Sequence, residues 1–278
     1  MYRTNLSIFI FCIFLLSNCS ISKQASTEQI NKKNINLLLN SAESYTKRHD
    51  YLSSIPFLIN AYNHSLLLNQ DTISSTNLAF SIAKAYYLCK NDSLFNFWLF
   101  KAKGLSIKNP DLVSSKMLFF RIDTLLMEKQ YETLSEIKIP DSYSVFNDEY
   151  YLALSKVLFA GYMVNKSNSD LLNLLIEKGG NKSIYYLETK AYIWFMIAEI
   201  FSCENKNIEA EFYYHKAIEA SKKTGDFSLA AIVYEKLGDL SLRYKSNKNI
   251  EYYIKSSDFY FMCNDTSKAN LMLLKCKQ

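Results

Sequence analysis

Glycine and proline are scarce in this chain, with 6 glycines and 3 prolines among 278 residues. A β-sandwich or barrel needs many turns, and a nucleotide-binding α/β fold needs glycine-rich loops, so both classes are disfavoured. A large excess of one charge is also missing, since 32 basic and 27 acidic residues give a net charge of +5. This balance is too even to argue for nucleic-acid binding.

Catalytic and metal-binding motifs are missing as well. The sequence contains no HExxH, GxSxG, P-loop or GxGxxG pattern and no Cys-x-x-Cys pair. The three histidines, His49, His64 and His215, lie on segments far apart. We therefore expect no enzyme activity, no cofactor and no metal site.

The remaining composition is that of a folded chain, with 49% hydrophobic and 21% charged residues. A chain of this length buries roughly 70–75% of its unfolded surface, so it needs no disulfides. We expect Cys89 and Cys203 to be small core residues. Cys263 and Cys276 flank the last turn, and whether they pair stays open.

The N-terminus carries a targeting signal. The apolar run from Ile8 to Leu16 follows a basic start and is far shorter than the roughly 20 residues that span a bilayer, which is typical of a secretory signal. The run ends in Leu16-Ser17-Asn18-Cys19, which resembles the bacterial lipobox. The alternative is an ordinary signal peptide that happens to contain a cysteine.

The lipobox resemblance implies that residues 1–18 are removed and that Cys19 is lipidated. Residues 20–28 are polar and lack periodicity, so residues 19–28 are expected to be the lipidated cysteine and a tether. No aspartate or acidic run follows Cys19. By the same resemblance, this favours a membrane-anchored lipoprotein of the outer membrane that faces the periplasm.

The body of the chain repeats every 40 or 41 residues. In its clearest unit, large, small and aromatic residues alternate at helical spacing, at Trp194, Ile197, Ala198, Phe201, Ala210, Tyr214 and Ala217. This unit resembles the tetratricopeptide repeat (TPR). The spacing recurs at Leu38, Ser41, Ala42, Tyr45, Ser54, Leu58 and Ala61, at Ala79, Ile82, Ala83, Tyr86, Phe95, Leu99 and Ala102, and at Tyr234, Leu237, Gly238, Ile250, Ile254 and Ser257.

The small residues have a steric role, because alanine or glycine lets the two helices of a hairpin approach closely. The sequence therefore predicts an all-α fold, a right-handed α-solenoid of about six TPR-like hairpins and a C-terminal capping helix. The usual TPR period is 34 residues. A HEAT-like repeat, which has a similar length to the unit seen here, stays open as the alternative.

The predicted solenoid covers residues 29–278. It divides into two repeats over 29–107, degenerate repeats over 110–180, two repeats over 183–263 and a capping helix over 265–278. Whether the irregular middle is a site or sequence drift stays open. A helix end is expected at Gly225 and a chain break at Gly179-Gly180. Helix starts are expected at Asp71, Asp92, Asp111, Asp148, Ser183, Asp226 and Asp265.

The TPR resemblance also implies a concave groove lined by the first helix of each hairpin. Its expected lining residues are Phe80, Lys84, Tyr87, Tyr192, Phe195, Glu199, Glu235, Asp239 and Arg243. We expect a non-catalytic, membrane-anchored scaffold lipoprotein that binds a protein or peptide partner in the cell envelope. The alternatives are an envelope signal-sensing regulator and a glycan-capturing accessory lipoprotein.

Overall fold

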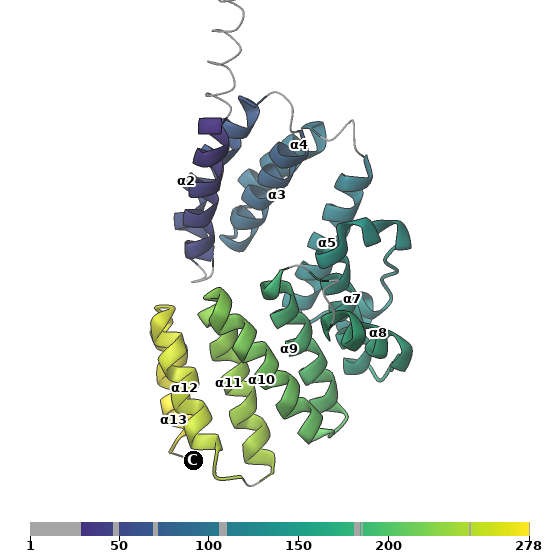
Figure 1. Ribbon diagram of the computed structural model, residues 1–278, viewed down its shortest axis with the longest axis vertical. Coiled ribbons are helices and arrows are strands. Elements are labelled where there is room, and N and C mark those ends of the chain that lie inside the picture. Colours follow the sequence, from purple (N-terminus) through teal and green to yellow (C-terminus); the bar gives the residue numbers. More distant parts are fainter. Residues whose placement is uncertain are drawn as a thin grey trace, which may run out of the picture. The chain divides into compact units, whose positions relative to one another are not determined.

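The computed structural model of the chain describes residues 29–46, 50–68, 72–105, 110–180, 184, 186–244 and 246–277. Over these ranges the chain is helical throughout, with one 3₁₀ segment and no strand (Figure 1). Cys19, the predicted signal peptide and the predicted tether lie outside the described residues. The prediction of an all-α fold is confirmed.

The helices follow one another as antiparallel pairs. Helical residues 29–46 precede α2 (Tyr51–Leu66), and α3 (Thr72–Leu88) pairs with α4 (Asp92–Leu105). The next pairs are α5 (Pro110–Met127) with α6 (Tyr131–Ser135), α7 (Asn147–Met163) with α8 (Ser169–Gly180), α9 (Leu187–Cys203) with α10 (Asn207–Thr224) and α11 (Phe227–Arg243) with α12 (Asn249–Met262). A last helix, α13 (Thr266–Lys275), packs on α12. This order is consistent with a helical repeat array.

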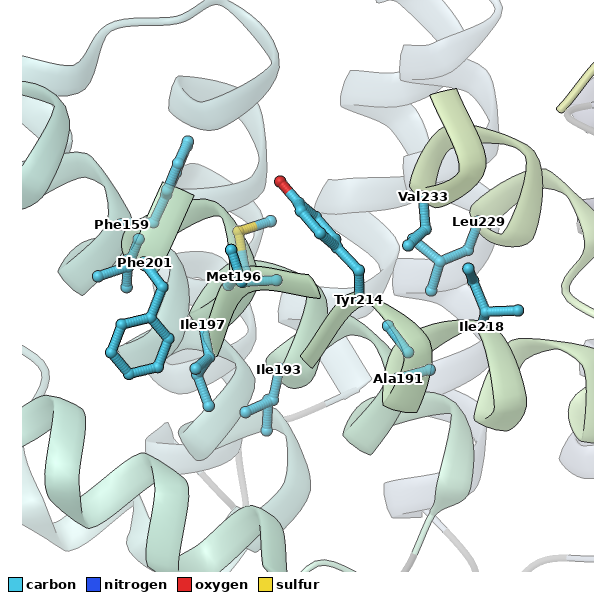
Figure 2. Packing of buried hydrophobic residues seen from close by; sticks show 14 of the residues in the cluster. Phe159, Ala191, Ile193, Met196, Ile197, Phe201, Tyr214, Ile218, Leu229 and Val233 are labelled. Carbon is cyan, nitrogen blue, oxygen red and sulfur yellow. The ribbon is translucent and has the colours of Figure 1, made fainter. Parts of the chain in front are cut away.

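The chain forms two compact units, which we describe separately. In the N-terminal unit, described over 29–46, 50–68 and 72–105, the core gathers around Ile82, Ala79 and Ala102, each fully buried. In the C-terminal unit, described within 110–277, the largest core gathers around α9. Figure 2 shows Ile193 and Ile197 of α9 with Tyr214 of α10 and Val233 of α11 in this core.

The same turn ends the first helix of successive hairpins. A residue with positive φ is followed by a backbone N–H that donates to the carbonyl five residues earlier, as in Lys206 to Phe201 at 2.9 Å after Asn205. This Schellman-type turn satisfies carbonyls that the helix end would leave unpaired. It recurs at Lys90, Lys129 and Asn165. The irregular middle of the chain therefore keeps the hairpin turn, although its sequence pattern is weak.

The predicted small positions lie where helices cross. Ala42, Ala83 and Ala198 are buried, and a Cβ added to Gly238 would lie 2.5 Å from Cε1 of Tyr253. Close approach therefore requires the small residue, as predicted. The predicted register of α12 is wrong, because Ile250 and Ile254 are about half exposed.

Tyr253 and Ser256 occupy the core positions of α12 in their place. The reason is the contact with Gly238, because the ring of Tyr253 fills the space over that glycine. The rotation of α12 about its axis is therefore set by packing. It does not follow from the constant spacing of the sequence repeat. Of the residues predicted for this helix, Ser257 is buried.

The partner helix of α5 in the irregular middle is short. Helix α6 has only 5 residues and is followed by the 3₁₀ segment η1 (Asp141–Phe146). The predicted break at Gly179 and Gly180 falls instead in the last turn of α8. Gly179 is buried there, and a Cβ on it would lie 3.0 Å from Nε1 of Trp194.

Two of the predicted helix caps are confirmed. Asp226 accepts the backbone N–H of Leu229, and Asp265 accepts that of Lys268, each at 3.0 Å. The prediction for Asp92 is wrong, since the side chain of Asn91 accepts the N–H of Leu94 at 3.1 Å. Asp111 and Asp148 each lie one residue inside a helix, in α5 and α7, and Asp71 and Ser183 lie outside the described residues. Gly225 has a φ of 74° and ends α10 as predicted.

Among the described cysteines, Cys89, Cys203, Cys263 and Cys276, none is in a disulfide. Cys89 packs half-buried against the core of the N-terminal unit, as expected. The prediction that Cys203 is a core residue is wrong, because it is the exposed last residue of α9. Cys263 and Cys276 do not form a disulfide with each other. Among the described helices, none combines the length and apolar character needed to cross a bilayer.

Candidate binding groove

A groove of about 870 Å³ lies in the C-terminal unit. Its walls come from α5, α7, α9 and α11, which are the first helices of four consecutive hairpins. Its lining residues are Leu126, Met127, Lys129, Tyr131, Phe159, Met163, Phe195, Met196, Glu199, Ser202, Cys203, Tyr214, Ile232, Lys236, Asp239, Leu242 and Arg243. We call this hollow the groove.

The floor of the groove is apolar and continuous with the core. Phe159 and Met196 are almost fully buried, and Phe195 packs against Tyr214 with ring centroids 6.3 Å apart. Figure 2 shows Phe159, Met196 and Tyr214 on the same side of the α9 core. Because these side chains are held by core packing, the floor is formed before any ligand arrives.

The rim of the groove is also apolar, but it is exposed. Met127 is 59% exposed, Met163 42% and Leu242 52%. The Sγ of Cys203 lies 3.8 Å from the Sδ of Met163, which joins the ends of α7 and α9. Exposed apolar side chains that gather in one hollow are a sign of an interaction site.

Glu199 is the most strongly held charge in the groove. Its Oε2 lies 2.7 Å from Nζ of Lys236, and its Oε1 accepts the hydroxyl of Tyr214. Burial, together with the Glu199 charge, raises the pKa of Tyr214, so its hydroxyl stays a donor. Burial alone would lower the pKa of Lys236, but Glu199 outweighs it and the pKa is raised. Lys236 therefore stays charged, and Glu199 is internally satisfied.

The acids of α11 hold the last helix. Nζ of Lys275 on α13 lies 3.0 Å from both Glu235 and Asp239. Tyr253 donates to Asp239 at 2.8 Å and Tyr260 to Glu235 at 3.1 Å. Burial and the neighbouring carboxylate raise the pKa of each tyrosine. These two acids therefore have a structural role that the sequence pattern did not indicate.

The basic residues Arg243 and Lys129 of the rim, unlike the acids, are not held in ion pairs among the described residues. Arg243 donates through Nη2 to the hydroxyl of Ser202 at 2.6 Å. Neither Arg243 nor Lys129 forms an ion pair with a carboxylate of the part of the chain that the structure describes. Both side chains are exposed.

The predicted groove residues are divided between the two units. Phe195, Glu199, Asp239 and Arg243 line the groove, whereas Tyr192 packs half-buried against the core. Glu235 lies beside the groove but does not line it.

The other three predicted residues, Phe80, Lys84 and Tyr87, lie on α3 of the N-terminal unit. Phe80 packs against the core of that unit, and the ring of Tyr87 lies 5.6 Å from that of Phe95.

Sequence reasoning missed the rim residues Met127, Lys129, Met163 and Leu242. They follow from a signal that was available, because they lie in or just after the last turn of consecutive first helices. Three of these four belong to the irregular middle, where the repeat pattern gives no register.

Within the described ranges, no group of three His, Cys, Asp or Glu side chains could hold a metal ion.

The surroundings of the described histidines are those of ordinary structural residues. His64 contacts Asn31 through Nδ1 at 3.2 Å, and His215 lies 3.8 Å from Glu211.

Comparison of the sequence with models of protein families and with curated proteins found no match.

Proposed function

We propose that this protein is a non-catalytic scaffold lipoprotein of the cell envelope that binds a protein or peptide partner in the groove. The observation that carries the proposal is the groove itself. Its apolar floor and exposed apolar rim cross the first helices of four consecutive hairpins. Covering an apolar surface of this kind removes it from water and lowers the free energy of the system. Glu199, Lys236 and Asp239 are held in ion pairs and Arg243 by a hydroxyl, which suits recognition better than proton transfer.

We infer that the hairpins are TPR-like and form a right-handed solenoid. Two features support this assignment: small residues at the helix crossings, and the recurrent turn after α3, α5, α7 and α9. In such arrays the first helices of successive repeats line one surface. This is the arrangement of α5, α7, α9 and α11 around the groove.

The anchor is proposed from the sequence. The apolar run before Cys19 and the Leu-Ser-Asn-Cys segment support lipidation at Cys19. One acyl chain holds a protein only marginally, with a binding constant of about 10⁴ M⁻¹, so stable anchoring needs more than one chain. The lipobox family carries three chains. The absence of an acidic segment after Cys19 supports the periplasmic face of the outer membrane.

The test is in-cell crosslinking of the full chain followed by affinity isolation and mass spectrometry. We expect one protein in near-stoichiometric amount, reduced by Met163→Glu in the groove and mislocalised in Cys19→Ala. Lys223→Gln, at an exposed pair on α10, serves as the control variant and should leave recovery unchanged. Recovery of glycan without protein, or recovery that Met163→Glu does not alter, would contradict the proposal.

A further inference from the structure

The charged side chains that line the groove carry a net positive charge, with Lys129, Lys236 and Arg243 against Glu199 and Asp239. Each lining carboxylate is already bound, Glu199 by Lys236 and Tyr214, and Asp239 by Tyr253 and by Lys275, which also pairs with Glu235. Arg243 contacts only a neutral hydroxyl at 2.6 Å, and Lys129 is exposed without an ion pair among the described residues. The groove is therefore complementary to a ligand that carries negative charge.

These two basic residues lie at the ends of the outermost two of the four first helices that line the groove. Lys129 follows α5, the first of the four helices, and Arg243 ends α11, the last. Between them, each helix ends in one exposed apolar or sulfur side chain, in the order Met127, Met163, Cys203 and Leu242. The rim is thus an apolar stripe with a basic residue at each end.

The chemistry of the stripe favours a protein segment. Methionine is flexible and polarisable, and it is common at surfaces that adapt to protein partners. A guanidinium can accept a carboxylate in two parallel hydrogen bonds. The contact with Ser202 holds Arg243 in place, so less conformational entropy is lost on binding.

The dimensions limit the ligand further. Neighbouring packed helices lie about 8–10 Å apart, so the distance across four of them is about 24–30 Å. An extended chain rises about 3.3 Å per residue, so it spans this distance in about 7–9 residues. Two acidic side chains at that separation would reach both basic ends.

We propose that the groove binds an extended segment of a partner protein that is apolar in the middle and has an Asp or Glu at each end, about 7–9 residues apart. This inference rests on the proposed function, because it names the chemistry of the partner at the same site. A single carboxylate on an apolar chain, as in a fatty acid, would satisfy only one of the two basic ends.

The experiment is selection of a phage-displayed random 12-residue peptide library on the immobilised full chain. Enriched peptides are then synthesised with a fluorescent label, and their affinities are measured by anisotropy. We expect aliphatic, Met or aromatic residues between two acidic positions at the stated spacing. Arg243→Gln should weaken binding about 10–100-fold, the range for a hydrogen bond to a charged group. Lys129→Gln, at an exposed site, should weaken it about 2–5-fold.

Two further variants and one competitor complete the peptide-binding experiment. Lys223→Gln is the matched basic control outside the groove and should leave affinity unchanged. Met163→Glu should abolish binding by placing a charge on the exposed stripe. Sodium dodecanoate should not displace an enriched peptide at stoichiometric concentration.

Enrichment of neutral or basic peptides whose binding ignores Arg243→Gln would overturn this inference and leave the proposed function standing. Failure to enrich any peptide that Met163→Glu weakens would overturn both. Displacement of peptides by stoichiometric dodecanoate, with loss on Arg243→Gln, would assign the groove to a fatty acyl ligand and overturn the inference.

Discussion

The ring of Tyr253 lies directly against Gly238, so that a Cβ on the glycine would come within 2.5 Å of Cε1. The ring has little freedom to move, because Tyr253 is 2% exposed and its hydroxyl donates to Asp239 at 2.8 Å. This contact fixes how α12 sits on α11. It also fixes the position of Asp239, which holds Lys275 of α13.

Gly238→Ala should therefore destabilise the C-terminal unit. Overpacking costs about 1–3 kcal/mol, and the higher helix propensity of alanine offsets up to about 1 kcal/mol. We expect a net loss of up to about 2 kcal/mol in the free energy of unfolding, measured by urea denaturation. Gly180→Ala is the matched control, because a Cβ there meets no atom within 4 Å. Equal effects of the two variants would contradict the packing argument.

Ala198→Leu should overpack the crossing of α9 with its neighbours. Ala198 is fully buried in the core around α9, so the added carbons have no free volume. The expected loss is about 1–3 kcal/mol, seen as a lower midpoint of thermal unfolding by circular dichroism. Asn270→Leu, at an exposed position of α13, should change the midpoint little. An unchanged midpoint in Ala198→Leu would mean that the helices are packed differently.

Alkaline pH should destabilise the C-terminal unit through its buried tyrosines. Burial, followed by the charge of Glu211, raises the pKa of Tyr252 to about 12. Because the pKa is raised in the folded state, the contribution is complete below the unfolded value of about 10 and is lost as the pH rises towards 12.

The free energy of unfolding should fall between pH 10 and 12, and Tyr252→Phe should flatten this slope. Urea denaturation at successive pH values measures it. Tyr186→Phe is the control because Tyr186 is 66% exposed. A slope that both variants flatten equally would contradict the assignment to Tyr252.

Cys203 should report occupancy of the groove by its rate of alkylation. It is exposed at the rim, whereas Cys263 is buried and should react only on unfolding. Burial of the sulfur and the charge of Glu199 raise the pKa of the Cys203 thiol, so labelling with N-ethylmaleimide should accelerate above pH 9.

Mass spectrometry of the labelled peptides measures both rates, and a groove-bound peptide should slow labelling of Cys203 alone. Faster labelling of Cys263 than of Cys203 in the folded protein would contradict the position of Cys203. Slowing of Cys276 by the same peptide would show that protection is not specific to the groove.

The sequence by itself determined the helical class and the hairpin order. Scarce glycine and proline disfavoured β-rich and nucleotide-binding folds, and small residues recurring at helical spacing predicted the crossings at Ala83, Ala198 and Gly238. These signals are local, because periodicity and side-chain size act within one hairpin. Two predicted caps, Asp226 and Asp265, were correct for the same reason.

Only the tertiary structure decided the register of α12 and the composition of the groove. The repeat offset placed Ile250 and Ile254 in the core, but the fit of Tyr253 over Gly238 turned them to the surface. Likewise, Asp239 was predicted from its position as a ligand contact, yet Lys275, more than thirty residues later, already pairs with it. Charge pairing and helix rotation depend on neighbours that come together only on folding, and sequence spacing carries no record of them.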